Sequence, residues 1–162
     1  MGIVPQLLAQ GTDAPGFSLR DQRGLIHDLG HYRGRWIVLY FYPRDETPGC
    51  TVEAKAFQSH GAEFAAAGAV VLGVSRDSRE RHERFAAHCG LEFPLLSDSD
   101  GAVVEAYGAK GLLLGTARVT YVIDPLGKVR AAFSFLSPRR HVAEALRLVA
   151  KAEPPTTQPV SR

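Results

Sequence analysis

The sequence predicts an α/β fold in which a mixed central β-sheet is flanked by helices and preceded by an N-terminal β-hairpin. The run WIVLYFY at 36–42 is β-branched or aromatic almost throughout, which is typical of a strand buried on both faces. Strands and helices alternate after this run, and the alternation indicates parallel strands joined by right-handed crossovers. A turn containing Pro and Gly at 124–127 then joins two further strands as an antiparallel hairpin, which makes the sheet mixed.

The elements up to residue 68 follow from local patterns. Residues 17–29 contain two short alternating segments around a polar turn with Gly24, and they predict a small hairpin at an edge. After the buried strand at 36–42, a helix is expected over about 50–67, and Gly68 suits its C-terminal end. One face of this helix should be buried, and it consists of Cys50, Ala54, Phe57, Gly61, Phe64 and Ala65.

The second half of the chain continues the alternation. Ser78 is a suitable N-cap for a helix with a heavily charged outer face, and Ser137 followed by Pro138 opens the last helix. The expected elements are strands at 70–74, 93–96, 118–124 and 128–133, and helices at 78–88, at 101–107 and from 137 onward. The last helix should bury Val142, Ala145, Leu146 and Val149.

One domain accounts for this order of elements. The predicted sheet and helices lie within residues 1–151, and their arrangement fits the thioredoxin-like class. Residues 152–162 are rich in Pro and Thr, and we expect them to form a disordered tail. The sequence contains no visible repeat and no second domain.

The composition is that of an ordinary globular protein, and it excludes several classes of partner. The chain has 162 residues, of which 45% are hydrophobic and 22% charged, and its net charge is +2. Without a concentrated basic footprint, neither nucleic acid nor a membrane surface is expected as the main partner. We expect no signal peptide, and no run is long enough to predict a membrane-spanning helix. With only two cysteines, we expect reactive or buried thiols in a reducing cytoplasm.

The segment after the first buried strand carries the candidate chemistry. It reads FYPRDETPGCTVEA (41–54) and lies where open α/β sheets place their sites. Thr47 can cap the helix, Pro48 suits the first helical position, and Gly49 allows close backbone approach. Cys50 falls in the first turn, where unpaired N–H groups and the helix dipole favour the nucleophilic thiolate. The alternative is that Cys50 is a small apolar residue that starts an amphipathic helix.

This segment resembles the active-site motif of the peroxiredoxins, in particular that of the PrxQ or bacterioferritin comigratory protein branch. Segments 90–108 and 118–124 are also similar to that branch, and the resemblance can be followed from about residue 11 to residue 149. It implies a thiol-dependent peroxidase with an antioxidant role, which reduces hydrogen peroxide and organic hydroperoxides with a thiol donor such as thioredoxin or glutaredoxin. It further implies a monomer that needs no cofactor and no metal.

The resemblance also implies a role for four residues. Cys50 matches the peroxidatic cysteine, which attacks peroxide and becomes a sulfenic acid. Pro43 matches the proline that shields the pocket, Thr47 the threonine that contacts the peroxide, and Arg118 the arginine that completes the site. A guanidinium there would stabilise the thiolate and donate hydrogen bonds to peroxide oxygens, whereas the alternative for Arg118 is a surface arginine at a strand end. Glu53 could orient Arg118, although we favour a solvated helix carboxylate on sequence alone.

A second thiol must then resolve the oxidised Cys50. Many members of the branch carry this thiol five residues later on the same helix, where this chain has Lys55, so that mechanism is excluded. Others carry it on the next helix, at a position occupied here by Ala86. Cys89 lies one turn further along and can resolve Cys50 only if the first turn of the Cys50 helix unwinds. Otherwise Cys89 is inert and an external thiol resolves a one-cysteine peroxidase.

Other candidates carry weaker signals. His82, His88 and Cys89 lack the spacing of a zinc site, and we expect both histidines on a charged helix face. Residues 98–101 predict a turn and helix cap rather than a calcium loop. Residues 111–115 predict an exposed apolar loop that could contact a peroxide tail or a partner, or could only pack on the Cys50 helix. The absence of a C-x-x-C pair counts against a disulfide oxidoreductase. A thioredoxin-fold binding or chaperone module with non-catalytic cysteines is the alternative function.

Overall fold

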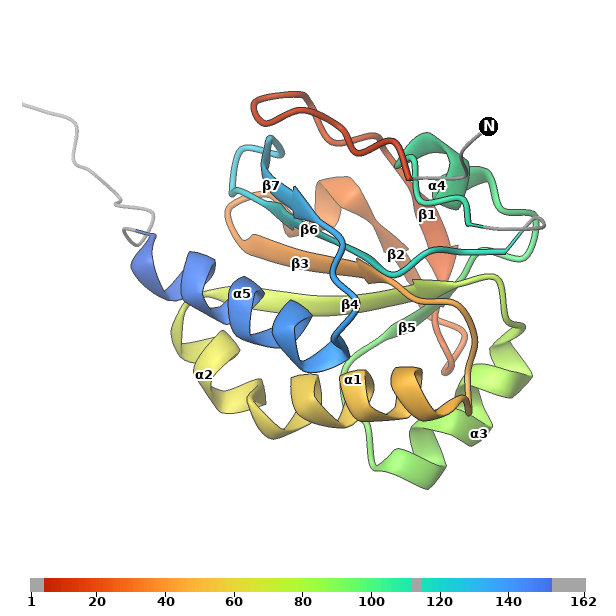
Figure 1. Ribbon diagram of the computed structural model, residues 1–162. Coiled ribbons are helices and arrows are strands. Elements are labelled where there is room, and N and C mark those ends of the chain that lie inside the picture. The colour runs from red at the N-terminus through yellow and green to blue at the C-terminus, as the bar shows by residue number, and fades with distance from the viewer. Residues whose placement is uncertain (1–4, 112–114, 153–162) are drawn as a thin grey trace, which may run out of the picture.

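The computed structural model describes residues 5–111 and 115–152, which form a five-stranded mixed sheet with helices on both faces (Figure 1). The strand order is β5-β4-β3-β6-β7, in which β3, β4 and β5 are parallel, and β6 is antiparallel to both β3 and β7. A separate antiparallel hairpin of β1 and β2 precedes the sheet. The predicted fold class is therefore confirmed. The strands are β1 (Ser18–Arg20), β2 (Ile26–Asp28), β3 (Trp36–Phe41), β4 (Ala69–Ser75), β5 (Leu95–Ser97), β6 (Val119–Ile123) and β7 (Val129–Phe133).

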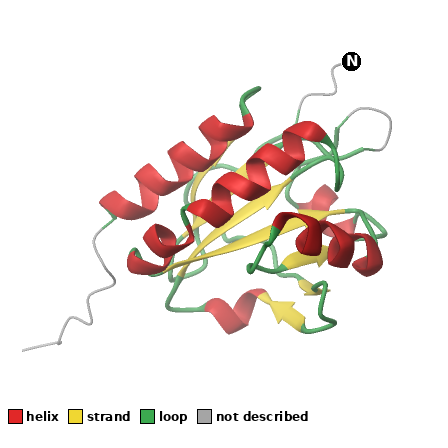
Figure 2. Ribbon diagram, turned by 90° about the horizontal axis from the view of Figure 1, so that it is seen from below, coloured by secondary structure: helices red, strands yellow, loops and turns green. Residues whose placement is uncertain are grey.

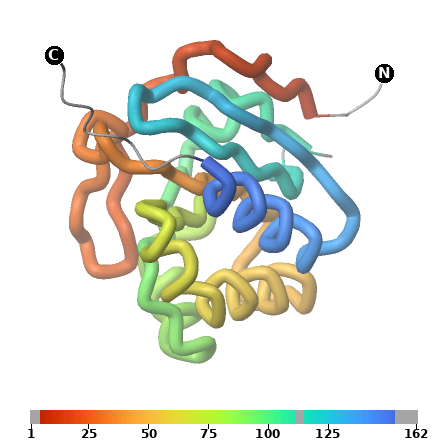
Figure 3. Tube along the Cα trace, turned by 90° about the vertical axis from the view of Figure 1, so that its left-hand side faces the viewer, coloured from red at the N-terminus to blue at the C-terminus, as the bar shows by residue number. Residues whose placement is uncertain are grey.

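The helices are arranged around this sheet in two groups. The α-helices are α1 (Pro48–Ser59), α2 (Gly61–Ala66), α3 (Arg79–Cys89), α4 (Ala102–Ala106) and α5 (Pro138–Lys151), and one 3₁₀ helix, η1, spans Leu29–Tyr32. Helices α1, α2, α3 and α5 pack on one face, and α4 packs on the other. Figure 2 distinguishes the helices from the strands that they cover, and Figure 3 shows α5 alongside α1 and α2. No helix among the described residues has both the length and the apolar character needed to cross a membrane.

Two hydrophobic cores lie on the two faces of the sheet, and β3 contributes to both. Val38 and Tyr40 pack with α1, α2, α3 and α5, whereas Ile37 and Leu39 pack with α4 and the N-terminal segment. All six residues of β3 are buried, as its sequence predicts. Because burial of one large apolar side chain contributes about 1.5–3 kcal/mol, this strand firmly anchors the segment that follows it.

The helix predicted over 50–67 is in fact two helices. Helix α1 ends at Ser59, α2 begins at Gly61, and His60 lies between them with φ −100° and ψ 13°. The low helix propensity of glycine gives a physical reason for the interruption. Phe64 is buried as expected, but Ala65 is exposed, so its assignment to the buried face is wrong.

The predicted helix starts after residue 77 and after residue 136 are confirmed. The hydroxyl of Ser78 accepts a hydrogen bond from the Arg81 amide (3.2 Å), and that of Ser137 accepts one from the Arg140 amide (3.3 Å). The predicted tail at 152–162 lies almost entirely outside the described residues, and the domain boundary at residue 151 remains a prediction.

The register of the sheet brings three distant parts of the chain to one place. Phe41, the last residue of β3, pairs with Val74 near the end of β4 and with Val119 at the start of β6. Because β6 runs antiparallel to β3, the residue that precedes β6 must lie beside the chain that leaves β3. That residue is Arg118, and the chain that leaves β3 leads to Cys50.

Candidate active site

The thiol of Cys50 lies in the first turn of α1, just after the loop that follows β3. Pro48 occupies the first turn as predicted, and Cys50 is 1% exposed. Thr47 is the N-cap residue, but its hydroxyl donates to the Arg44 carbonyl oxygen (2.8 Å) and makes no cap hydrogen bond. Thr47 is thus at the predicted N-cap position, but the side-chain hydrogen bond expected of a cap is not made. The amides of Gly49 and Cys50 belong to the first turn of α1, whose N–H groups have no partner within the helix.

Arg118 reaches the same turn from the start of β6. Its Nη2 lies 3.7 Å from the Sγ of Cys50, so the structure brings these two predicted site residues together. Glycine at position 49 suits this approach, because a Cβ there would lie only 2.9 Å from Arg118 Nη2; Pro138 Cγ, at 3.7 Å, would be in ordinary contact. Arg118 is mostly buried, with its side chain 16% exposed, so the alternative of a solvated surface arginine is wrong.

Glu53 holds the other end of the guanidinium. Its Oε1 lies 2.5 Å from Arg118 Nη1, and its side chain is completely buried, so the prediction of a solvated helix carboxylate is wrong. The sequence contained a signal for this, because Glu53 is three residues after Cys50 and lies beside Ala54 on the buried stripe. Burial raises the pKa of Glu53 to about 8, and the charge of Arg118 limits the rise. Burial lowers the pKa of Arg118, but the anionic groups around it outweigh burial and raise that pKa overall.

The proton on Glu53 should make folding stability depend on pH. The folded protein holds this proton up to about pH 8, whereas the unfolded chain releases it near the ordinary value of 4.5. This contribution to stability is therefore complete below pH 4.5 and is lost as the pH rises toward 8. Between these values, the free energy of unfolding of wild type should fall relative to Glu53→Gln, with a difference in slope of up to about 1.4 kcal/mol per pH unit.

Urea unfolding at several pH values measures this difference in slope. Glu83→Gln is the matched control, because Glu83 is an exposed carboxylate on α3, and its slope should equal that of wild type. Equal slopes in wild type and Glu53→Gln would show that the folded protein does not retain the proton on Glu53.

His141 on α5 closes the side of the site behind Glu53. Its ring is buried, its Nε2 lies 2.9 Å from the Phe135 amide nitrogen and 3.1 Å from the Phe135 carbonyl oxygen, and its Nδ1 lies 2.8 Å from Thr120 Oγ1. Burial lowers the pKa of His141 to about 4, so the ring is neutral near pH 7, and Thr120 faces its Nδ1. Oε2 of Glu53 lies 3.9 Å from this nitrogen and has no hydrogen-bond partner among the described residues. Sequence patterns did not indicate His141 as part of the site.

The other predicted residues are placed as follows. Pro43 is exposed at the start of the loop between β3 and α1. Cys89 is half-buried at the C-terminal end of α3, and it packs against the hydrophobic core to which Cys50 belongs. Burial raises the pKa of the Cys89 thiol, while the nearby charge of Lys55 opposes the rise. Of the two histidines predicted on a charged face, His88 is exposed, but His82 is completely buried, so that prediction is wrong for His82.

Two further predictions concern loops. Asp98 accepts hydrogen bonds from the amides of Val103 (3.2 Å) and Val104 (2.8 Å), which confirms the predicted turn and helix cap. The predicted apolar loop at 111–115 lies mostly outside the described residues.

The arrangement around Cys50 fits the chemistry of peroxide reduction. A guanidinium contacts a buried thiol in the first turn of a helix, and such donors stabilise both a thiolate and negative charge that develops on oxygen. The mixed sheet, the N-terminal hairpin and this site together define a thiol-dependent peroxidase with a thioredoxin-like fold.

Comparisons with known proteins agree with this class. The model of the AhpC/TSA family matches residues 10–132, and the chain belongs to this family. It is 40% identical over 151 residues to "Peroxiredoxin Q, chloroplastic" of Triticum aestivum, which covers 91% of this chain and 70% of the relative. It is 41% identical over 145 residues to the protein of the same name from Sedum lineare, with 88% and 78% covered. Within the family, the chain is thus a peroxiredoxin of the Q, or bacterioferritin comigratory protein, branch.

Solved structures give the same result. The structure of peroxidoxin BcpB from Mycobacterium tuberculosis has a TM-score of 0.84 and 35% identity, with 89% of this chain and 97% of that chain covered. Peroxiredoxin Q from Xanthomonas campestris has a TM-score of 0.79 and 37% identity, with 83% and 89% covered.

Proposed function

We propose that Cys50 is the peroxidatic cysteine of this thiol-dependent peroxidase. Its thiolate sulfur attacks the terminal oxygen of a hydroperoxide, so that an S–O bond forms while the O–O bond breaks. The electron pair of the broken bond leaves on the other oxygen, which takes up a proton as water or an alcohol. Cys50 is oxidised to a sulfenic acid. The 3.7 Å contact between Arg118 Nη2 and Cys50 Sγ is the observation that supports this proposal most directly.

The groups around Cys50 have separate tasks in this step. Arg118 stabilises the thiolate before attack and donates hydrogen bonds to the peroxide, and Glu53 positions the guanidinium through Nη1. The amides of Gly49 and Cys50 stabilise the charge that develops on the departing oxygen. The hydroxyl of Thr47 lies at the entrance to the helix and can turn from the Arg44 carbonyl toward a bound peroxide. Pro43, at the start of the same loop, shields the pocket.

The surroundings of the pocket suit organic hydroperoxides as well as hydrogen peroxide. Because Cys50 is only 1% exposed, just the peroxide end of a substrate can enter, and the remainder must lie outside. Pro138 lies against the first turn of α1, and the preceding Leu136 is fully exposed, which leaves apolar surface beside the entrance. The bacterioferritin comigratory protein of Xanthomonas campestris, one of the similar solved structures, has alkyl peroxide reduction activity.

Cys89 is the better candidate for the resolving thiol. Helix α3 lies next to α1, and the carboxylate of Glu46, in the loop before α1, contacts His88 beside Cys89 (2.7 Å). Both cysteines occupy helix ends, Cys50 the first turn of α1 and Cys89 the last residue of α3 before Gly90. Opening of these two terminal turns would bring the sulfurs together without disruption of the sheet. The Cys89 thiol then attacks the sulfenic sulfur, and water leaves as the disulfide forms.

Mass spectrometry after one equivalent of hydrogen peroxide tests this assignment. The expected product is an intramolecular disulfide between Cys50 and Cys89, whereas Cys89→Ser should accumulate a sulfenic acid on Cys50 that dimedone traps. Sulfenic or sulfinic acid on Cys50 of the wild type, with Cys89 still reduced, would contradict the assignment. An external thiol would then resolve Cys50 directly.

The disulfide, or the sulfenic acid, must be reduced by a second protein. Thioredoxin-type reductants serve the peroxiredoxins, and we propose thioredoxin or glutaredoxin for this chain. Its thiol cycle suits a reducing cytoplasm, and no second subunit is required to complete the site, which is consistent with a monomer. The near-neutral composition offers nucleic acid no basic footprint.

A further inference from the structure

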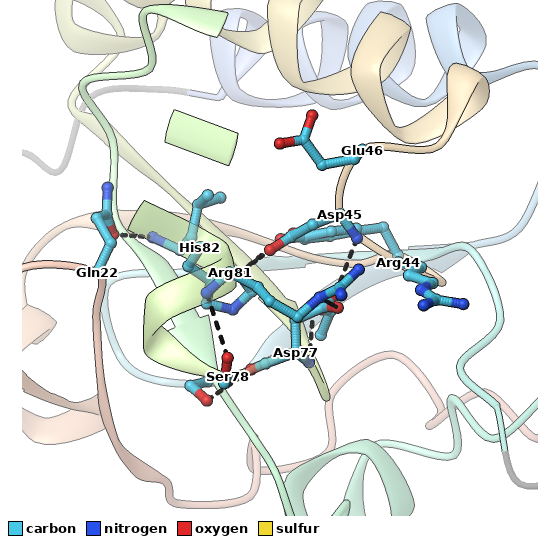
Figure 4. Close-up of polar contacts among 12 residues, drawn as sticks. Gln22, Arg44, Asp45, Glu46, Asp77, Ser78, Arg81 and His82 are labelled. Atoms are coloured by element: carbon cyan, nitrogen blue, oxygen red, sulfur yellow. Dashed lines mark hydrogen bonds and ion pairs between the residues drawn. The ribbon is translucent and has the colours of Figure 1, made fainter. Parts of the chain in front are cut away.

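A second buried polar cluster lies behind the loop that leads to Cys50. It consists of Tyr42 and Asp45 from the loop, Asp77 from the segment between β4 and α3, and His82 from α3. The side chains of Asp45 and His82 are completely buried. Among the described residues, they form hydrogen bonds with each other, with Tyr42 and with the backbone of Leu96, and not with Cys50 or Arg118. Figure 4 shows Asp45 within this cluster, while Arg44 and Glu46 on either side of it point away. The peroxidase chemistry leaves these buried groups unexplained.

His82 joins the loop to the sheet through both of its ring nitrogens. Nε2 lies 3.0 Å from the carbonyl oxygen of Leu96 on β5, and Nδ1 lies 2.7 Å from Asp45 Oδ2. A carbonyl oxygen only accepts, so Nε2 must carry a proton. One further proton must lie between Nδ1 and Oδ2, because two bare acceptors at 2.7 Å would repel each other. The ring is therefore a bridge that fixes Asp45 relative to the central sheet.

Asp45 is held through its side chain and its backbone. The Tyr42 hydroxyl donates to Oδ1 (2.6 Å) and His82 binds Oδ2, while the Asp45 amide donates to Asp77 Oδ2 (2.9 Å). Asp77 is itself fixed by the hydroxyl of Ser75 (2.6 Å). Asp45 lies midway between Pro43 and Thr47, so these contacts fix the centre of the catalytic loop.

The same residues could be taken for a metal site. Ligand atoms of Asp45, Asp77 and His82 lie within 4.8 Å of one another. Each of these atoms, however, already has an internal hydrogen-bond partner, and Asp77 Oδ2 accepts from both the Asp45 amide and Ser75. Arg81 Nε also donates a hydrogen bond to Asp77 Oδ1 (2.9 Å). The contacts describe a completed hydrogen-bond network and not a set of ligands that awaits a cation.

The loop needs such an anchor because of its backbone conformation. Glu46, directly after Asp45, has a φ of +67°, and it is the single non-glycine residue with positive φ in the described part of the chain. A side chain in the left-handed region is strained, and this conformation persists only where the surrounding structure imposes it. The contacts of Asp45 impose it here. One residue further on, Thr47 begins α1 and sets the direction in which the first turn presents Cys50.

We propose that the buried Asp45–His82 pair is a positioning element for the peroxidase reaction, which holds the strained turn at Glu46 and thereby places Thr47 and the first turn of α1 against the incoming peroxide. This inference rests on the proposed function of Cys50. It assigns His82 and Asp45 to the reaction although neither touches the reacting atoms.

The rate constant for oxidation of Cys50 by hydrogen peroxide, measured by competition with a haem peroxidase, tests the role of the pair. Asp45→Ala should lower it by about 100-fold, the size of effect expected when a reacting group is displaced by roughly 1 Å. Asp45→Asn should remain much closer to wild type, because its oxygen can accept from Tyr42 and its NH₂ can donate to a neutral His82. If Asp45 served stability alone, folded Asp45→Ala and folded Asp45→Asn would have the same oxidation rate constant.

Glu46 offers a matched pair of variants for the strained turn. In the Asp45→Ala background, Glu46→Gly should recover about fivefold of the rate, because glycine adopts positive φ without strain. Glu46→Ala should recover none, although it removes the same contact with His88. Equal rates in these two double variants, or a wild-type rate in Asp45→Ala, would overturn the proposal.

A further control separates loss of folding from loss of positioning. All rates are compared where circular dichroism shows each variant to be folded, and His82→Gln replaces Asp45→Ala if the latter does not fold. A wild-type rate in folded His82→Gln would also overturn the proposal. The wild-type protein in the same assay tests the proposed function independently, since its Cys50 must react faster than a free thiol whatever the variants do.

Discussion

Replacement of Cys50 by serine should reduce peroxide consumption to the rate of the reductant alone. A serine hydroxyl is not ionised near neutral pH and is a poor nucleophile, so no sulfenic acid can form. The expected loss is about 10³-fold or more, as is usual when a catalytic nucleophile is removed. Consumption of hydrogen peroxide with dithiothreitol as the reductant measures it. Because the side chains are nearly the same size, Cys50→Ser should fold normally.

Cys89→Ser is the matched control for this prediction. It removes the other cysteine of the chain and leaves Cys50, so with dithiothreitol present it should keep the first oxidation step at the wild-type rate. If wild type is no faster than Cys50→Ser, Cys50 is not the peroxidatic residue. The alternative of a binding or chaperone module with non-catalytic cysteines would then gain support.

Replacement of Arg118 by alanine should produce the second largest loss. The guanidinium is 3.7 Å from the Cys50 sulfur and lies in a mostly buried site, where a fixed cation acts more strongly than in water. Removal of one such preorganised donor costs about 10²–10³-fold in rate, and we expect that range for oxidation of Cys50. Arg118→Lys should recover little, because a single ammonium cannot bind Glu53 and face the sulfur in the same fork geometry.

Two controls separate this effect from a loss of folding. Arg147 on α5 is also paired with a carboxylate, Glu144 (2.5 Å), but this pair is at the surface, so Arg147→Ala should keep the wild-type rate. Arg118→Ala leaves the buried Glu53 carboxyl group without its guanidinium partner, which could destabilise the fold. The double variant Arg118→Ala/Glu53→Gln removes this complication. A rate near wild type in the double variant would show that Arg118 does not act on the thiol.

The sequence predicted the order of elements because the relevant signals are local and strong. A continuous apolar run marks β3, serine caps mark α3 and α5, and the Cys50 motif follows the end of a buried strand. Arg118 was found only through the resemblance to a family, since 68 positions separate it from Cys50. Its contact with the thiol depends on the antiparallel register of β6 with β3, which no local pattern specifies.

The misassigned residues have a common cause. Glu53 and His82 were treated by residue type, as a carboxylate and a histidine on charged helices, and both are completely buried. Their positions contained the opposite signal: Glu53 is on the stripe of Cys50, Ala54 and Phe57, and His82 precedes Phe85 by three positions on the buried face of α3. Asp45 had no such signal, because it lies in an irregular loop without periodicity.

The dependence of the site on strand register has a consequence for synthesis of the protein. Cys50 leaves the ribosome well before Arg118, and until β6 pairs with β3 the nascent chain carries an ordinary cysteine without its guanidinium partner. A slip of two residues in that pairing would shift Arg118 by about 7 Å and leave the thiol equally unassisted. Under the proposed role of Cys50, peroxide reactivity should therefore arise only with the completed sheet, and incomplete or misfolded copies should be spared rapid oxidation at this cysteine.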